Sequence, residues 1–164
     1  MRRPLTAVVL LAVVLLAGAV VTGVRWHRAE NDPGLDAAHA RDAALAVAQS
    51  AAVGLNTLDY RNPGAAPVAW KRLATGDLYT SLVGGKGDYQ QLITSTKAFT
   101  TATATGAAVQ SLSDANKTAV VLVGLDVTVT PAQGQASVEH ERLVLTMTRT
   151  STGWKASAMQ PVAD

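Results

Sequence analysis

The sequence predicts an α+β domain, in which about three helices pack on a curved, four-stranded antiparallel sheet, behind an N-terminal transmembrane helix. Three observations predict this arrangement. Leu5–Val24 contains 20 consecutive residues without a charge. The part of the chain before Thr100 repeats its apolar residues at helical spacing, and the part after it alternates apolar with polar residues. Helices followed by strands with short connections favour an α+β fold with an antiparallel sheet.

The uncharged run Leu5–Val24 has the length of a membrane-spanning helix. The hydrocarbon core of a bilayer is about 30 Å thick, which about 20 helical residues cross. Arginines flank the run on both sides, and Trp26 beside them suits a membrane–water interface. The sequence therefore predicts three N-terminal segments, which are a cytoplasmic tail at 1–4, a transmembrane helix at 5–24 in the lipid bilayer, and a juxtamembrane tether at 25–35.

A cleavable signal peptide is the alternative interpretation of the same run. Its basic start would be Arg2 and Arg3, its apolar centre Leu5–Leu16 and its small-residue cleavage site Ala17–Ala19. The apolar run continues as far as Val24, and this total length favours a retained anchor. The chain has no cysteine, so it cannot be a lipoprotein.

Basic residues are concentrated around the predicted anchor. Four of the 14 Lys and Arg flank it and all 12 Asp and Glu follow it, so ten basic residues remain in 29–164 and the net charge there is −2. This balance gives no basic surface for nucleic acid. We expect the short tail to stay in the cytoplasm and residues 36–164 to form one extracytoplasmic domain of the cell membrane. Without disulfides, this domain must rely on its core.

The first helix of the domain is predicted from Ala37 to about Leu58, with Asp36 as its cap. Its apolar face recurs at helical spacing and consists of Ala38, Leu45, Ala48, Ala52 and Leu55. Because this face is mostly alanine, we expect the helix to pack closely on its neighbour.

Shorter helices follow a break at residues 59–64. Pro67 suits the first turn of the second helix, and we expect Gly76 to end it. Asp77 starts another short helix, and Gly84–Gly87 interrupts the helical pattern. A last helical stripe is formed by Tyr89, Leu92, Ile93, Thr96 and Phe99.

Four strands complete the predicted domain. They are Thr100–Leu112, Thr118–Thr130, Ser137–Thr150 and Trp154–Met159, separated by turns at 113–117 and 151–153 and by a loop at 131–136. Alternation is clearest in the second strand, where one face carries Ala119, Val121, Val123, Leu125, Val127 and Val129. In the last two strands the residues expected to face the core are Leu143, Leu145, Met147, Trp154, Ala156 and Ala158.

No catalytic, cofactor-binding or metal site is predicted. The histidines His27, His39 and His140 are scattered, and strand alternation places His140 on the opposite face from its acidic neighbours. Gly84–Gly87 lacks the spacing of a phosphate-binding loop. Asp126 lies in the middle of the best strand and is the strongest candidate for a general base inside a closed cone, although such a position more often simply faces solvent.

Two aromatic residues leave a further question open. Tyr60 and Trp70 either line a pocket or form an aromatic core between helices, which is the commoner arrangement.

Several segments resemble the actinobacterial Mce-associated (mammalian cell entry-associated) membrane proteins. In order, they are the basic tail with its single membrane helix, Ala40–Ala44 running into Leu55–Tyr60, Leu73–Tyr79, Ala119–Thr130 and Gly153–Lys155. Their order and spacing carry the resemblance, and Gly84–Gly87 departs from it. The resemblance implies a fold like the nuclear transport factor 2 (NTF2-like) or VirB8 domains, without catalytic residues. It also implies an accessory or scaffold role beside Mce lipid or sterol import machinery in the cell envelope.

Two functional classes follow from the sequence. The first is a membrane-anchored scaffold subunit that contacts Mce transporter subunits or homologous accessory proteins, without enzymatic activity or cofactors. The second is a small-molecule pocket protein or a steroid-isomerase-like enzyme on the same fold. A closed cone containing a polar residue and a pocket of a few hundred Å³ would favour the second class. A filled cone with an apolar outer patch would favour the first.

Overall fold

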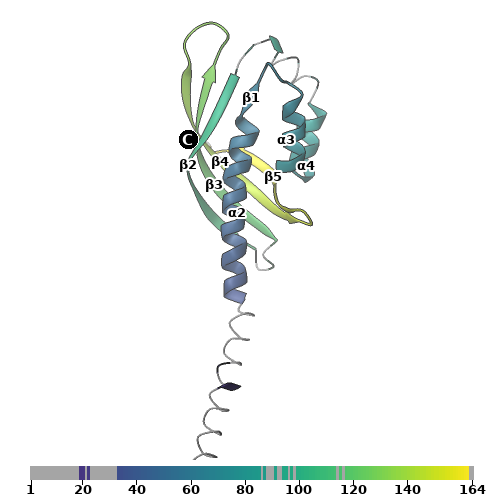
Figure 1. Ribbon diagram of the computed structural model, residues 1–164, viewed down its shortest axis with the longest axis vertical. Helices are drawn as coiled ribbons and strands as arrows, with labels where there is room; N and C mark the ends of the chain where they lie inside the picture. The colour runs from purple at the N-terminus through teal and green to yellow at the C-terminus, as the bar shows by residue number, and fades with distance from the viewer. Residues whose placement is uncertain are drawn as a thin grey trace, which may run out of the picture. The chain divides into compact units, whose positions relative to one another are not determined.

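Three helices and five strands follow one another in the described part of the chain. They are α2 (Pro33–Asn56), β1 (Leu58–Asp59), α3 (Ala65–Leu73), α4 (Gly76–Gly84), β2 (Phe99–Leu112), β3 (Thr118–Thr130), β4 (Ser137–Thr150) and β5 (Gly153–Pro161). The strands form one antiparallel sheet in the order β1-β2-β3-β4-β5. Figure 1 shows α2 lying across one face of this sheet, and α3 and α4 beside β5.

The structure, a computed structural model, describes residues 19–20, 22, 33–85, 87, 91, 94–95, 97, 99–113, 115 and 117–162. The chain divides into two units, Met1–Asp36 and Ala37–Asp164, and the sheet belongs to the second. Most of the predicted anchor lies outside the described residues, as do Tyr89, Leu92, Ile93 and Thr96 of the last predicted helical stripe. Within the residues described, no helix is long and apolar enough to cross a bilayer.

Helix α2 packs on the sheet through alanine. Ala44, Ala48, Ala51 and Ala52 are fully buried and belong to the same core cluster as the inward rows of β3 and β4. The predicted apolar face of this helix is therefore buried in the core. The expected place of Ala38 on that face is wrong, because it is exposed. The buried row begins at Ala40, and two residues along a helix turn the side chain by about 200°.

The alanine face leads to a prediction about overpacking. Replacing Ala48 by leucine adds three carbons where the side chain is fully buried. We expect this change to lower the free energy of unfolding by about 1–3 kcal/mol, because a well-packed core must shift to admit the larger side chain. Ala46, on the exposed side of the same helix, provides the control, and Ala46→Leu should stay within about 0.5 kcal/mol. Urea unfolding of both variants measures the difference, and equal effects would contradict the burial of this face.

The sheet has five strands rather than the four predicted, because α2 ends earlier than expected. The hydroxyl of Thr100 donates to the carbonyl of Asn56 at 2.9 Å and accepts the N–H of Leu58 at 3.0 Å. The hydroxyl of Thr57 accepts the N–H of Ala102 at 3.3 Å. These bonds attach the chain to β2 immediately after the helix. Leu58–Asp59 therefore pairs with β2 as the short strand β1, where the sequence predicted the last turn of the helix.

The ends of the helices differ from the prediction in three further places. Helix α2 begins at Pro33 rather than at Ala37, and proline is favourable in a first helical turn. Gly76 does not end α3; it opens α4 with φ +56°. The reason is that the N–H of Thr75 donates to the carbonyl of Ala156 at 2.8 Å, which holds the connection in an extended form against β5. Phe99, expected on a helix, starts β2.

Strands β3 and β4 have the predicted bounds and the predicted inward rows. Val121 and Leu145 are fully buried, and the expected inward residues of these strands all belong to or pack against the core. In β5, Trp154 and Ala156 are buried as expected. Ala158 is not on the core face, because an irregularity in the β4–β5 pairing shifts the alternation by one residue. Met159 packs against the core instead.

A hydrogen-bonded serine holds this irregularity. The hydroxyl of Ser157 donates to the carbonyl of Thr146 at 3.1 Å and accepts the hydroxyl of Thr148 at 2.9 Å. Ser157 is the extra residue, and its hydroxyl is hydrogen-bonded at the point where the inward and outward positions of β5 exchange.

Candidate functional site

The space between α2 and the sheet is filled by apolar side chains. Among the described residues, none that is polar or charged is buried. Leu125 and Leu145 are essentially inaccessible beneath the alanine face of α2, and Trp70 of α3 joins the same cluster with 3% of its surface exposed. Trp70 is therefore a core residue. Tyr60 is only half-buried and lies with Arg61 and Phe99 at the β1 end of the sheet, so the two aromatic residues do not share a pocket.

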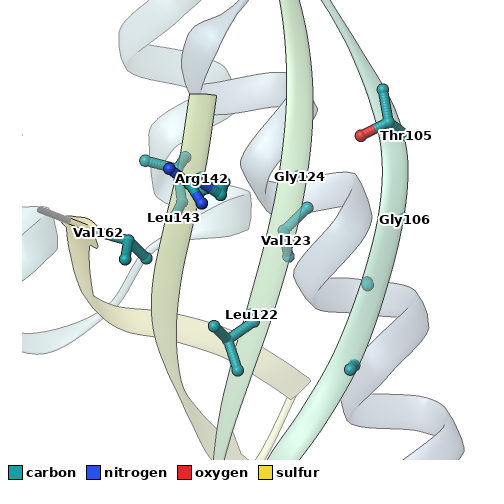
Figure 2. A pocket seen from close by; sticks show the side chains of 10 residues that line it. Thr105, Gly106, Leu122, Val123, Gly124, Arg142, Leu143 and Val162 are labelled. Atoms are coloured by element: carbon teal, nitrogen blue, oxygen red, sulfur yellow. The ribbon is translucent and has the colours of Figure 1, made fainter. Parts of the chain in front are cut away.

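The other side of the sheet, which we call the open face, carries a mainly apolar hollow. It has a volume of about 590 Å³ and opens at the surface. Its lining comes from β2, β3, β4 and the residue after β5: Thr105–Ala108, Leu122–Gly124, Arg142, Leu143 and Val162. Figure 2 shows these neighbouring strands side by side, with the side chains of Leu122, Thr105 and Arg142 around the hollow.

Two glycines form the floor of this hollow. Gly106 and Gly124 face each other across β2 and β3, next to a bulge at Thr105. A Cβ on Gly124 would lie 2.7 Å from the Thr105 hydroxyl oxygen, which is closer than real contacts allow. Glycine at position 124 therefore makes room for the bulged threonine. The adjacent Leu122 side chain is 38% exposed and supplies the apolar surface beside the floor.

Asp126 also lies on the open face and is paired with His140. The two residues are opposite each other in β3 and β4, and Nδ1 of His140 lies 2.6 Å from Oδ1 of Asp126. The side chains are 79% exposed for His140 and 40% for Asp126. The expectation that Asp126 would lie opposite the apolar row is confirmed, but it does not lie inside a closed cone. No sequence signal indicated its pairing with His140, since the pairing depends on strand register.

The remaining candidate residues do not converge. His39 is exposed on α2, and His27 lies outside the described residues. No three His, Asp or Glu side chains come together in the described ranges in a way that could hold a metal ion. At the glycine-rich interruption, α4 ends at Gly84, and the N–H of Gly85 donates to the carbonyl of Ser81 at 3.0 Å. The described glycines here thus belong to the end of a helix, and their spacing is not that of a phosphate-binding loop.

The β1 end of the sheet carries a local ion pair. Nε of Arg61 lies 2.8 Å from Oδ1 of Asp59, and a second guanidinium nitrogen lies 3.0 Å from Oδ2. The hydrogen bonds from Arg61 lower the pKa of Asp59. The same guanidinium lies over the Phe99 ring, 5.3 Å from its centre. The pair is exposed and shapes the turn after β1, which is a structural role.

Known proteins resemble this chain in fold rather than in sequence. No family model matches it, and no curated protein does. Among solved structures, the chain is similar to the periplasmic domain of DotI, with a TM-score of 0.61 and 18% identity over 73% of this chain and 93% of that one. It is also similar to an IcmL-like type IV secretion system protein from Legionella pneumophila. There the TM-score is 0.58 at 18% identity, over 73% of this chain and 91% of that one.

A looser likeness is found to an NTF2-like superfamily protein from Salmonella enterica, with a TM-score of 0.47 and 17% identity over 73% of this chain and 93% of that one. For DotI and the IcmL-like protein, the likeness at 18% identity shows the fold and nothing further. The chain therefore contains a domain of the NTF2-like/VirB8-like fold, built from three described helices on a five-stranded antiparallel sheet.

Proposed function

We propose that this protein is a membrane-anchored scaffold subunit that acts through protein–protein contacts. Residues 5–24 would hold it in the membrane with the N-terminus in the cytoplasm, and residues 36–164 would lie outside. The observation that carries this proposal is the filled interior. The face of the sheet beneath α2 is occupied by alanine, valine and leucine, and an accessible apolar hollow lies beside Leu122 on the open face. An accessible apolar patch is typical of an interaction surface.

The more specific part of the proposal is an association with an Mce-type lipid or sterol import system. It rests on the order and spacing of the segments that resemble Mce-associated proteins, from Ala40–Ala44 to Gly153–Lys155. The two similar structures, a type IV secretion system protein and a periplasmic domain, support by analogy a domain of this fold that works in a membrane-bound assembly.

The alternative function, a small-molecule pocket protein or isomerase, has one observation in its favour. The hollow on the open face, at about 590 Å³, falls within the size range of ligand sites. Ligand sites usually bury most of their ligand, however, whereas this hollow opens at the surface. Asp126 does not line it, and its carboxylate is engaged by His140. The scaffold function therefore agrees better with the geometry.

Complementation of a strain that lacks this gene and is defective in lipid uptake tests the proposal. Deleting residues 2–28 should abolish function by releasing the domain from the membrane. An unrelated single-pass anchor in place of residues 2–28 should restore it, and a cleavable signal peptide there, which exports without anchoring, should not. Restoration by the cleavable signal would contradict the anchor.

Asp126→Asn separates the scaffold from the enzyme in the same assay. It keeps the shape of the side chain and removes the charge, and Asp42→Asn on the exposed side of α2 is its matched control. A scaffold should tolerate both changes. A general base contributes about 10²–10⁴-fold to a rate, so a null phenotype for Asp126→Asn alone, at normal membrane abundance, would favour the enzyme.

A further inference from the structure

The outer edge of β2 is open over most of its length. On that side, β1 pairs only with Phe99 and Thr100, and the Thr57 hydroxyl accepts the N–H of Ala102. From Thr103 to Leu112, no strand pairs with this edge within the described residues. In Figure 1, β2 lies at the margin of the sheet, on the far side of β3 from β5. The edge therefore presents backbone N–H and C=O groups that a further strand could bind.

The register identifies the groups that point outward. The N–H of Ala102 points away from β3, towards Thr57. Antiparallel pairing alternates, so Ala104 points outward as well, and beyond the bulge at Thr105 the outward residues are Ala107 and Val109. The side chains of these last three residues pack against the core. The edge is thus held in an extended form by its own packing and needs no ordering before it can pair.

The composition of β2 leaves this edge almost unprotected. Natural edges are blunted by charged side chains, proline or bulges. Strand β2 has irregularities beside Thr105 and Gln110 but no charged residue and no proline in its 14 residues. Between them, the regular stretch Gly106–Val109 begins with a glycine that crowding does not explain. A Cβ on Gly106 would meet no atom within 4 Å, and its φ is not positive. Glycine within a strand often marks a bulge, and Gly106 directly follows the one at Thr105.

We propose that the β2 edge binds the β2 edge of a second copy of this chain, in the antiparallel register that places Ala108 opposite Ala108 of that copy. Only an extended segment can satisfy a row of alternating N–H and C=O groups. In a two-fold pair of this register Ala108 lies on the axis and faces its own copy, so a charge there would face a like charge and repel it. A strand without charges is suited to this arrangement, and pairing an edge with itself closes the dimer.

Single cysteines in the full-length protein test the pairing directly, because the chain has none of its own. Ala108 is exposed on the edge, in the middle of the open stretch. Residues directly opposite in antiparallel strands have Cβ atoms about 5 Å apart, close to disulfide geometry. In membranes treated with a mild oxidant, Ala108→Cys should give a disulfide-linked homodimer as the main species. Val138→Cys, exposed on the open face of β4, should remain monomeric.

Two variants of opposite charge at position 108 distinguish a specific dimer from accidental cross-linking. Ala108→Lys and Ala108→Glu should each abolish the dimer measured by native mass, whereas the two variants expressed together should restore a heterodimer. Circular dichroism of each variant checks that the fold is kept, which its exposed position leads us to expect. The proposal is overturned if Ala108→Cys cross-links no more than Val138→Cys. It is also overturned if Leu122→Lys, on the open face, removes a dimer that Ala108→Lys leaves intact, or if the cross-linked product contains a different protein.

Discussion

Replacing Leu125 by alanine is expected to lower the free energy of unfolding by about 2–5 kcal/mol. Leu125 lies in the middle of β3 with 1% of its surface exposed, between the alanine face of α2 and the neighbouring strands. Its removal loses apolar burial and leaves a cavity, because the short alanine side chains above it have few atoms that can move in to fill the space. Urea or thermal unfolding of the purified protein measures the loss.

Thr128, three residues further along the same strand, provides the control. It is half-buried and lies on the open face. Thr128→Ala should cost well under the loss at Leu125, since most surface substitutions stay within about 0.5 kcal/mol. Similar small effects at both positions would mean that the core does not lie on the face that carries Leu125.

Replacing Trp70 by alanine is expected to cost about 3–5 kcal/mol of stability. Trp70 is the buried residue of α3 and belongs to the common core cluster. Its removal should therefore destabilise the whole domain. Val68 of the same helix is 63% exposed, and Val68→Ala is the matched control with little expected effect. The measurement is again chemical unfolding.

The Trp70 experiment also tests whether Trp70 is a core residue or lines a ligand pocket. A tryptophan that lines a ligand pocket can be removed at a modest cost in stability, with the main loss in function. Removing a core tryptophan instead causes its main loss in stability, and function falls because the protein unfolds. A variant that unfolds at the midpoint of the parent protein but fails in complementation would contradict the core role of Trp70.

Strands β3 and β4 were predictable because buried residues alternate with more accessible ones along them. Each inward residue from Val121 to Leu125 is followed by one on the other face, so the sequence itself records which face is buried. The bounds of β1 could not be predicted in this way. A strand of two residues shows no alternation in the sequence. It forms because the Thr100 hydroxyl binds the Asn56 carbonyl and the Leu58 N–H, which are 44 and 42 residues away along the chain.

The candidate surface was even less accessible to sequence reasoning. The pairing of Asp126 with His140 and the facing glycines Gly106 and Gly124 are consequences of register between strands. Periodicity assigns a face to each residue but does not say which residue of the next strand lies opposite. Ala158 was expected on the wrong face for the same reason. The extra residue Ser157 exchanges the two faces of β5, and only the pairing with β4 reveals that it is extra.

The alanine face of α2 has a consequence for how this protein changes in evolution. Where side chains are already the smallest that still favour a helix, a larger residue overpacks the core and glycine weakens the helix. The four fully buried positions, Ala44, Ala48, Ala51 and Ala52, therefore tolerate little drift, whereas the outer face of the helix can change freely. Relatives of this chain should be recognised by the spacing of small residues in the helix ahead of the sheet, rather than by overall identity. Such a pattern can persist while most other positions change, and the fold itself is shared with solved structures at 18% identity.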